Sequence, residues 1–409
     1  MRLVTLAHNL RVAGGLSVGR NIISSLSRVA HNHEHLLILP SGVGYEDVEK
    51  PRRSSLVYYT RKLGTAGQRL FEMIELPRLV AAFQPDVVWG LGNFGLVNPR
   101  GAKQAILVHK PQFVYDAAHQ EREVWRQRYA NKLARRRLEQ SLPVTQLIFC
   151  QTETMAKRFG QAFQYQGRTA ILPNAVSRLL GQDDASPTPA PLAQMRSGFR
   201  LLSVAKYYPH KNLEVLVALF RRYASRLSDV AVILTVAADQ HPHAAQFLAT
   251  LHEPGVRDHI INVGPVDQSE LAGYYHHCDA LLMPTLLESF SGTYLEAMRF
   301  GRQILTSDLD FAREVCGAAA AYFNPFDVES ICETILRVKC SADLRAALVA
   351  AGRERMQRFF RDWDAIVLDA IQDLERLAGE RQLERRRTPH EETGLVHQTE
   401  VVAGRSNEK

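Results

Sequence analysis

Short apolar runs alternate with longer stretches of helical periodicity along most of the chain. Between the runs, apolar side chains recur every three or four residues, as expected of helices that bury one face. Strands that alternate with helices favour parallel sheets, because a parallel connection must return from one end of the sheet to the other. The pattern therefore predicts an α/β protein with two doubly wound parallel sheets. The predicted strands lie at residues 3–7, 36–40, 85–89, 105–109, 147–150 and 169–172, and then at 199–204, 230–235, 260–263, 280–283 and 303–306.

The stretch between these two series has the composition of a linker. Residues 181–191 contain three prolines among small and polar residues, which is typical of a domain boundary. A chain of 409 residues is also long for a single core. We expect an N-terminal domain over residues 1–178 and a C-terminal domain over residues 179–357. An amphipathic helix is predicted at residues 358–378, and the polar residues 379–409 are predicted to form a disordered tail.

The composition is ordinary for a globular protein in water. Hydrophobic residues make up 46% of the chain, which is enough for a core in each domain. No signal peptide is recognisable at the start, and no apolar run approaches the ~20 residues that span a bilayer. The five cysteines form no Cys-x-x-Cys pair and are odd in number, which suits a reducing compartment. We therefore expect a cytoplasmic protein.

Basic residues are unevenly distributed. Residues 1–180 hold 25 Lys and Arg against 12 Asp and Glu, whereas residues 181–409 hold 25 against 31. An anionic membrane, a phosphorylated acceptor, nucleic acid or a solvated helix face would each account for the excess. We disfavour nucleic acid, because no aromatic residues interleave with the arginines at 135–137 and the acidic C-terminal half would oppose it. The excess peaks at residues 121–139, which contain Arg122, Arg126, Arg128, Lys132, Arg135, Arg136 and Arg137.

The most informative polar stretch is Glu-Ser-Phe-Ser-Gly-Thr-Tyr-Leu-Glu at residues 288–296. It joins a predicted strand to a helix, where free backbone N–H groups and the helix dipole favour anionic ligands. Carboxylates aimed at a phosphate would repel it, so we interpret Glu288 and Glu296 as acceptors for hydroxyl groups of a ribose or a sugar. The spacing alone leaves open the alternative that both are solvent-exposed surface residues.

Three further features stand at predicted strand ends. Gly14 and Gly15 follow the first strand and would let the backbone approach a ligand closely, although the Gly-x-Gly-x-x-Gly fingerprint of a dinucleotide-binding dehydrogenase is absent. Lys206 and Lys211 follow the first strand of the second series and could hold a diphosphate, or could be two exposed lysines beside a turn. His109 ends its strand, at the edge where open α/β sheets bind ligands. A lone histidine is more often structural, so its position is the only argument for it.

Together these residues resemble the retaining, nucleotide-sugar-dependent glycosyltransferases of family four, which have the GT-B fold. Glu288 and Glu296 match the family's EX7E element, and the glycine pair and the lysine pair match its glycine loop and basic pair. The resemblance spans most of residues 1–375 and implies two Rossmann-like domains that face each other across a central cleft. Further matches in family order lie at residues 172–176, at residues 263–266, at Glu314 and at residues 322–325.

The resemblance implies a role for each matched residue. Lys206 and Lys211 would neutralise the donor diphosphate, Glu288 would contact the transferred sugar, and Glu296 would bind the ribose. Lys206 stands where the family often has arginine, so a bidentate phosphate contact is lost. The other expected donor contacts are Gly14, the backbone N–H of Gly15, His109 beside the sugar, the backbone of Phe290, Ser291 and Gly292, and the backbone near Val266 beside the base.

The implied reaction moves a hexose from a nucleoside-diphosphate sugar to a hydroxyl of a glycan, lipid-linked or small-molecule acceptor, with retention at the anomeric carbon. No cofactor and no metal are expected, although Asp308 and Asp310 formally make a DxD pair. The C-terminal helix would cross back to the N-terminal domain, as is usual in this fold. The basic N-terminal half is compatible with docking at the inner face of an anionic membrane.

Two other classes of protein remain open. The chain could bind a nucleotide sugar without transferring it, as a regulatory or interaction module. It could also be another GT-B enzyme, such as an epimerase or a phosphorylase. A phosphorylase of the glycogen type would need a pyridoxal-phosphate lysine and a much longer chain, which disfavours it.

Overall fold

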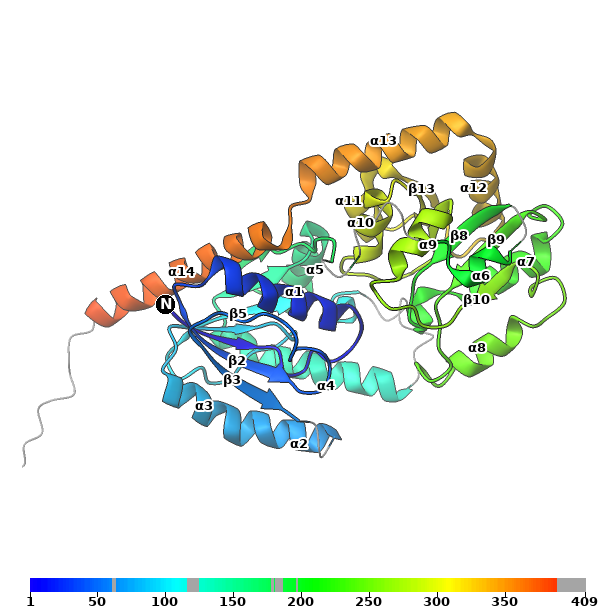
Figure 1. The fold of residues 1–409 in the computed structure, drawn as a ribbon. Helices are drawn as coiled ribbons and strands as arrows, with labels where there is room; N and C mark the ends of the chain where they lie inside the picture. The colour runs from blue at the N-terminus through cyan, green and yellow to red at the C-terminus, as the bar shows by residue number, and fades with distance from the viewer. Residues whose placement is uncertain (61–63, 116–124, 178–179, 181–186, 196–197, 388–409) are drawn as a thin grey trace, which may run out of the picture.

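The computed structural model of the chain describes residues 1–60, 64–115, 125–177, 180, 187–195 and 198–387. These residues form two parallel β-sheets, each covered by helices, which lie side by side as two domains (Figure 1). The predicted α/β architecture with two doubly wound sheets is confirmed. The predicted boundary at residues 178–179 and the predicted tail from residue 388 lie outside the described residues.

The sheet of the first domain has seven parallel strands in the order β3-β2-β1-β4-β5-β6-β7. Its order reverses between β1 and β4, and such a switch point leaves a crevice at the carboxyl ends of the strands. The strands are β1 (Arg2–Leu6), β2 (Glu34–Pro40), β3 (Ser54–Tyr59), β4 (Val87–Gly90), β5 (Lys103–Val108), β6 (Leu147–Cys150) and β7 (Arg168–Ile171).

The sheet of the second domain has six parallel strands in the order β10-β9-β8-β11-β12-β13. Its switch point lies between β8 and β11. The strands are β8 (Phe199–Ser203), β9 (Val230–Leu234), β10 (Ile260–Asn262), β11 (Ala280–Met283), β12 (Gln303–Ser307) and β13 (Ala320–Phe323).

Helices cover both faces of the first sheet, because successive strand residues point to opposite sides. On one face, Leu3 packs in a buried cluster with Ile22 of helix α1 (Ala13–Val29) and Leu374 of α14 (Trp363–Arg387). On the other face, Val4 packs in a cluster with Phe71. The helices on that second face are α2 (Gly64–Leu70), the π-helical segment η1 (Phe71–Glu75), α3 (Leu76–Phe83), α4 (Trp125–Ser141) and α5 (Glu153–Phe163).

The second domain is built in the same way. Its helices are α7 (Glu214–Tyr223), α8 (Ala244–Thr250), α9 (Leu271–His277), α10 (Gly292–Arg299), α11 (Asp310–Cys316), α12 (Val328–Cys340) and α13 (Ala342–Phe359). Short helical segments complete the described chain: η2 (Pro111–Phe113), η4 (Leu142–Val144), α6 (Ala190–Ala193), η5 (Pro209–Lys211) and η6 (Gly317–Ala319).

The C-terminal helix differs from its predicted bounds of residues 358–378. It begins at Trp363, because Asp362 accepts a hydrogen bond from the N–H of Ala365 at 2.8 Å and so caps a new helix. Helix α13 ends at Phe359, and Phe360 is extended. As expected from the family resemblance, α14 crosses back along α1 of the first domain (Figure 1).

The predicted disordered tail begins too early at residue 379, since α14 continues to Arg387. The side chain of Arg381 explains the extension. It is buried, donates a hydrogen bond to the carbonyl oxygen of Pro85, and lies 3.6 Å from the carboxylate of Asp86. The helix therefore continues through a polar stretch of sequence, because Arg381 in that stretch binds the backbone of Pro85 and lies near Asp86 in the first domain.

Two strands were missed, and both have weak sequence signals. Strand β3 lies at the sheet edge and exposes Leu56 and Tyr58, so its pattern is not that of a buried strand. Strand β13 begins with Ala320 and Ala321, and alanine is a poor strand former. Both strands form because a neighbouring strand already offers its hydrogen-bonding edge.

Candidate active site

A cleft of about 780 Å³ lies between the domains, beside the switch points of both sheets. This size is within the range of small-molecule sites. Residues from both domains line it, and all eleven predicted site residues are among them. They are Gly14, Gly15, His109, Lys206, Lys211, Val266, Glu288, Phe290, Ser291, Gly292 and Glu296.

Two helices from different domains begin at this cleft. Val12 precedes α1 and Ser291 precedes α10, and neither side chain caps its helix; neither helix carries an acidic residue in its first turn. The first N–H groups of each helix are therefore available to a ligand. Gly14 and Gly292 lie in these first turns, and among the described residues nothing would approach an added Cβ within 4 Å at Gly14. Two open helix N-termini on opposite walls favour an anion between them.

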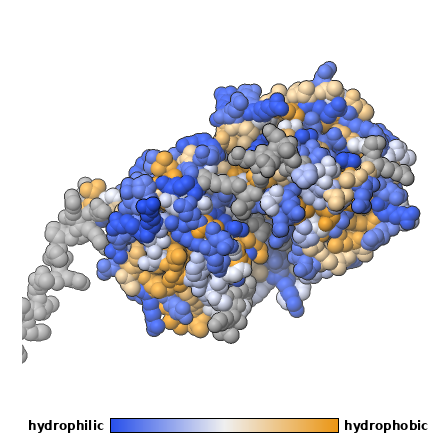
Figure 2. All heavy atoms as spheres, viewed as in Figure 1, coloured by the Kyte–Doolittle hydropathy of each residue, from blue (hydrophilic) through white to orange (hydrophobic). Residues whose placement is uncertain are grey.

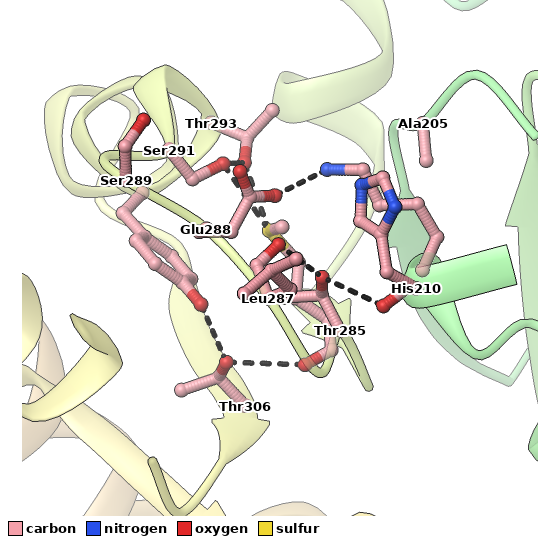
Figure 3. A network of polar contacts seen from close by, with 12 residues as sticks. Ala205, His210, Thr285, Leu287, Glu288, Ser289, Ser291, Thr293 and Thr306 are labelled. Atoms are coloured by element: carbon pink, nitrogen blue, oxygen red, sulfur yellow. Dashed lines mark hydrogen bonds and ion pairs between the residues drawn. The ribbon is translucent and has the colours of Figure 1, made fainter. Parts of the chain in front are cut away.

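Lys211 is held rigidly beside this position. It ends the turn η5, and Asn212 after it adopts a left-handed conformation with φ of 56°. The Asn212 side chain donates to the carbonyl oxygens of Pro284 and Pro325, at 3.2 and 2.9 Å. The Lys211 ammonium forms an ion pair with Glu288 (Figure 3). Lys206 is exposed on the cleft and has no acidic partner among the described residues.

The loop that carries Glu288 is fixed to the same turn. The N–H of Leu286 and the hydroxyl of Thr285 both donate to the carbonyl oxygen of His210, at 2.7 and 3.2 Å (Figure 3). Phe290 is buried and meets the ring of Phe360 edge-on, with ring centroids 5.9 Å apart. Its backbone lines the cleft while its side chain anchors the loop.

Glu296 lies one turn into α10 and is almost completely buried. The Tyr275 hydroxyl donates to one carboxylate oxygen at 2.8 Å. Burial raises the pKa of Glu296, and the hydrogen bond from Tyr275 offsets part of that rise. The second carboxylate oxygen remains an acceptor for a ligand hydroxyl in the cleft.

His109 follows β5 directly, and its backbone N–H donates to Asn93 at 2.8 Å. Burial, together with the charge of Lys110, lowers the pKa of His109 to about 4. The imidazole is therefore neutral at pH 7, so it can donate or accept one hydrogen bond but cannot act as a cation. An added Cβ at Gly15 would lie 3.6 Å from the His109 ring, so these two predicted residues face each other.

Ser289 connects the two walls of the cleft and was not predicted to have a role. Its hydroxyl lies 2.8 Å from the carbonyl oxygen of His109 and 2.7 Å from the side-chain oxygen of Gln151, and donates to one of them at a time. Gln151 in turn donates to Asn174 at 2.7 Å. Ser289, the residue next to Glu288, is thus tied to the backbone of His109. No spacing in the sequence indicates a contact across 180 positions.

Two carboxylates of the second domain, those of Glu314 and Asp310, bind groups of the first domain near this bridge. Glu314 of α11 accepts hydrogen bonds from the N–H groups of Glu153 and Thr154, at 2.6 and 2.9 Å, and so caps α5 of the other domain. Asp310 accepts from Arg158 and from the Tyr115 hydroxyl, each at 2.9 Å. Glu314 was matched to the family only by its order in the chain, and the structure shows a contact for it.

The DxD pair is engaged elsewhere. Asp308 pairs with Arg313, and Asp310 pairs with Arg158. Within the described parts of the chain, no three His, Cys, Asp or Glu side chains come together as metal ligands. Likewise, no helix in those parts is both long enough and apolar enough to cross a membrane.

Two Rossmann-like domains around a cleft with open helix N-termini define the GT-B class of fold. Among solved structures, sucrose-phosphate synthase from Thermosynechococcus elongatus matches with a TM-score of 0.71 at 16% identity, over 93% of this chain and 99% of the other. At that identity the likeness shows the fold alone. Residues 198–339 match the family described as glycosyl transferases group 1. Over those residues, the match confirms the resemblance seen in the sequence.

The chain is also similar to two curated mannosyltransferases. A phosphatidyl-myo-inositol mannosyltransferase of Mycolicibacterium smegmatis is 28% identical over 216 residues, which cover 51% of this chain and 54% of the relative. A GDP-mannose-dependent alpha-(1-6)-phosphatidylinositol monomannoside mannosyltransferase of Mycobacterium tuberculosis is 23% identical over 310 residues, 72% of this chain and 76% of the relative. The chain therefore matches about half the length of the first relative.

Proposed function

We propose that this protein transfers a hexose from a nucleoside-diphosphate sugar to an acceptor hydroxyl, with retention at the anomeric carbon. The observation that carries the proposal is the meeting of two open helix N-termini and two lysines in one cleft. A diphosphate between them would be neutralised by Lys206 and Lys211 and would accept hydrogen bonds from the first turns of α1 and α10.

The remaining contacts are assigned around that diphosphate. Glu296 accepts hydrogen bonds from the ribose, and the backbone near Val266 contacts the base. Glu288, oriented by its ion pair with Lys211, accepts hydrogen bonds from the transferred sugar. His109 stands on the opposite wall, where its neutral imidazole contacts the same sugar.

In the reaction, the bond between the anomeric carbon and the diphosphate oxygen breaks, and negative charge grows on that oxygen. The two lysines and the helix N–H groups stabilise this charge in place, because they are already oriented towards it. The acceptor oxygen attacks from the face that the diphosphate leaves, and its proton passes to the departing diphosphate. Of the described residues that line the cleft, only Glu288 and Glu296 are carboxylates. Because both have the roles assigned above, a mechanism without a covalent sugar–enzyme intermediate is favoured.

We assign the acceptor to the first-domain side of the cleft. The names of the two relatives refer to phosphatidylinositol-based substrates and, in one case, to GDP-mannose. These names and the basic first domain support a mannosyl-type donor, a lipid-linked acceptor, and action at the cytoplasmic face of an anionic membrane in surface glycan or glycolipid synthesis.

Thermal stabilisation of the purified protein by UDP, GDP, UDP-glucose and GDP-mannose tests the donor assignment. We expect either the uridine or the guanosine ligands to stabilise the protein selectively, and Glu296→Ala to weaken that stabilisation. The result would identify the base of the donor nucleotide. Stabilisation without hydrolysis or transfer of the sugar to any lipid or glycan acceptor would favour a non-catalytic sugar-nucleotide-binding protein. No stabilisation by any of the four would contradict the proposal.

A further inference from the structure

The basic run at residues 125–137 divides into two groups once its helix is in place. Two of its arginines are structural. Arg135 donates to the carbonyl oxygens of Phe113 and Ala162. Arg137 forms an ion pair with the largely buried Glu72. Burial alone would raise the pKa of Glu72, but the hydrogen bond from His8 and the charge of Arg137 outweigh it and lower that pKa to about 2.

The other basic residues of α4 stand on its outer side. Asn131 and Leu138 are buried and mark the inner side of the helix. On the opposite side, positions 125, 129, 132 and 136 form one ridge, because residues three and four apart share a helix face. That ridge consists of Trp125, Tyr129, Lys132 and Arg136, all exposed, and exposed Arg126 and Arg128 flank it.

The exposure of the two aromatic residues is unusual. Trp125 is 72% exposed and Tyr129 is 59% exposed, whereas Trp89 and Trp363 are buried. A tryptophan side chain has a large apolar surface that normally finds cover. The sequence-based argument considered only the arginines at 135–137, and the helix adds two exposed aromatic side chains beside its other basic residues.

The neighbouring helical layer continues the same surface. Leu70, Met73 and Ile74 of α2 and η1 are 55%, 76% and 42% exposed, beside exposed Arg69 and Arg78. The Arg137–Glu72 ion pair joins this layer to α4. Figure 2 shows apolar residues gathered at the lower side of the first domain, where Figure 1 places α2 and α3. We call the outer surfaces of α4 and of α2–η1–α3 the α4–η1 face.

Six exposed basic residues lie on the α4–η1 face, namely Arg69, Arg78, Arg126, Arg128, Lys132 and Arg136. The exposed acidic residues of the same elements are Glu75 and Glu139, and Glu139 pairs with Arg135. Basic groups interleaved with tryptophan, tyrosine and aliphatic side chains match the headgroup region of an anionic bilayer. A nucleic acid would satisfy the cations but would leave Met73 and Ile74 in water.

We propose that the α4–η1 face docks this protein on an anionic lipid bilayer, with Trp125, Tyr129 and Met73 inserted at the level of the headgroups. The inner side of α4 supplies Gln127 and Ala134 to the wall of the cleft. One helix thus contacts the bilayer and the cleft, so docking brings the cleft to the membrane surface. The role of docking rests on the proposed function, because it would bring the cleft to a lipid-linked acceptor. Docking itself can be measured without donor or acceptor.

Binding to vesicles of phosphatidylglycerol and phosphatidylcholine, compared with phosphatidylcholine alone, tests the proposal on the full chain. Because Trp89 and Trp363 are buried, a blue shift of tryptophan emission on docking should come from Trp125. Trp125→Phe should abolish the shift, as well as the quenching by lipids brominated near the headgroup. Wild-type binding should weaken steeply as salt is raised.

Lys132→Glu/Arg136→Glu should bind the anionic vesicles about tenfold more weakly or worse, because two attractive charges become repulsive. The matched control is Arg52→Glu/Arg100→Glu, which changes the same charge at exposed positions that precede the amino ends of β3 and β5, outside the elements of the α4–η1 face. It should bind as the wild type does.

If both double variants lost vesicle binding equally, the loss would depend on the net charge of the protein and not on the position of the charges. That result would overturn the assignment of the face. No binding of the wild type to anionic vesicles, or binding of nucleic acid in preference to them, would overturn docking itself. Nucleotide stabilisation measured on the same variants separates this failure from failure of the proposed function. It should be unchanged in all of them.

Discussion

The two walls of the cleft work by different means. The second-domain wall presents charged side chains, Lys206, Lys211, Glu288 and Glu296, and two of these are paired with each other. Of the predicted site residues, the first-domain wall presents backbone at Gly14 and Gly15 and a neutral imidazole at His109, and Arg11 and Lys110 line it as well. A charged side chain loses its function when it is shortened to alanine. An exposed backbone N–H group loses its function when a side chain is added to a glycine beside it. The difference therefore predicts opposite kinds of damaging substitution on the two walls.

The largest effect should follow Lys211→Ala. The change removes a cation from the diphosphate position and leaves Glu288 largely buried without its partner. Transfer should fall by about 10²–10³-fold, as when one stabiliser of a developing negative charge is lost. The measurement is turnover of the donor identified by thermal stabilisation.

Lys339→Ala is the matched control for this change. It removes the same side chain from an ion pair with Asp229 on the surface of the second domain, and it should leave transfer unchanged. Near-normal transfer by Lys211→Ala would mean that the charged wall does not stabilise the leaving group.

On the opposite wall, Gly15→Ala should lower transfer by about tenfold. The new methyl group would lie 3.3 Å from the side chain of Leu10, which must move slightly, and 3.6 Å from the His109 ring, in the space where a ligand would approach both residues. Gly14→Ala, whose methyl group would meet no described atom within 4 Å, should keep the same unfolding temperature as the wild type. An unchanged kcat in Gly15→Ala would show that the close approach at this position has no catalytic role.

A smaller effect should follow Ser289→Ala, which breaks the bridge between the walls. Loss of one buried hydrogen bond should cost about 1 kcal/mol of the free energy of unfolding. We expect kcat to fall more than donor affinity, because the hydrogen bond that fixes the loop of Glu288 relative to His109 would be lost.

The matched control for the bridge is Ser291→Ala, whose hydroxyl contacts Thr293 within the second domain at 2.8 Å. It should keep a higher kcat than Ser289→Ala. If the two variants have the same kcat, the connection between the domains is not what positions the two walls.

The smallest effect at neutral pH concerns the protonation of His109. Because burial lowers its pKa to about 4 from an ordinary 6.5, the unfolded chain binds a proton there before the folded protein does as the pH falls. The free energy of unfolding should therefore decrease between pH 6.5 and about 4. His109→Asn should show a shallower decrease over this window in denaturant titrations. Equal slopes would mean that His109 titrates normally in the folded protein.

Much of this molecule could be predicted because strong local signals agree with the fold. Strand β1 is buried on both faces, so Leu3 and Val4 stand in a continuous apolar run that is typical of a parallel sheet. The cleft residues stand at strand ends and helix starts, where parallel sheets bring ligands. The contacts that the sequence could not identify, such as those of Ser289 and Glu314, cross the domain interface. Their partners are far away in the chain, and no local period indicates them.

The sequence by itself determined the class of fold, the resemblance to a family and the candidate residues of the cleft, because these depend on local periodicity and on residue type. Only the tertiary structure decided which arginines of α4 are bound by neighbouring elements and which are exposed on its outer side. Arg135 and Arg137 are held by buried partners, whereas Arg136 between them is exposed beside Trp125 and Tyr129. Consecutive residues of one helix point in different directions, so their environments depend on the elements that pack around them. For the same reason, Glu288 and His109 became one site only when the two domains met.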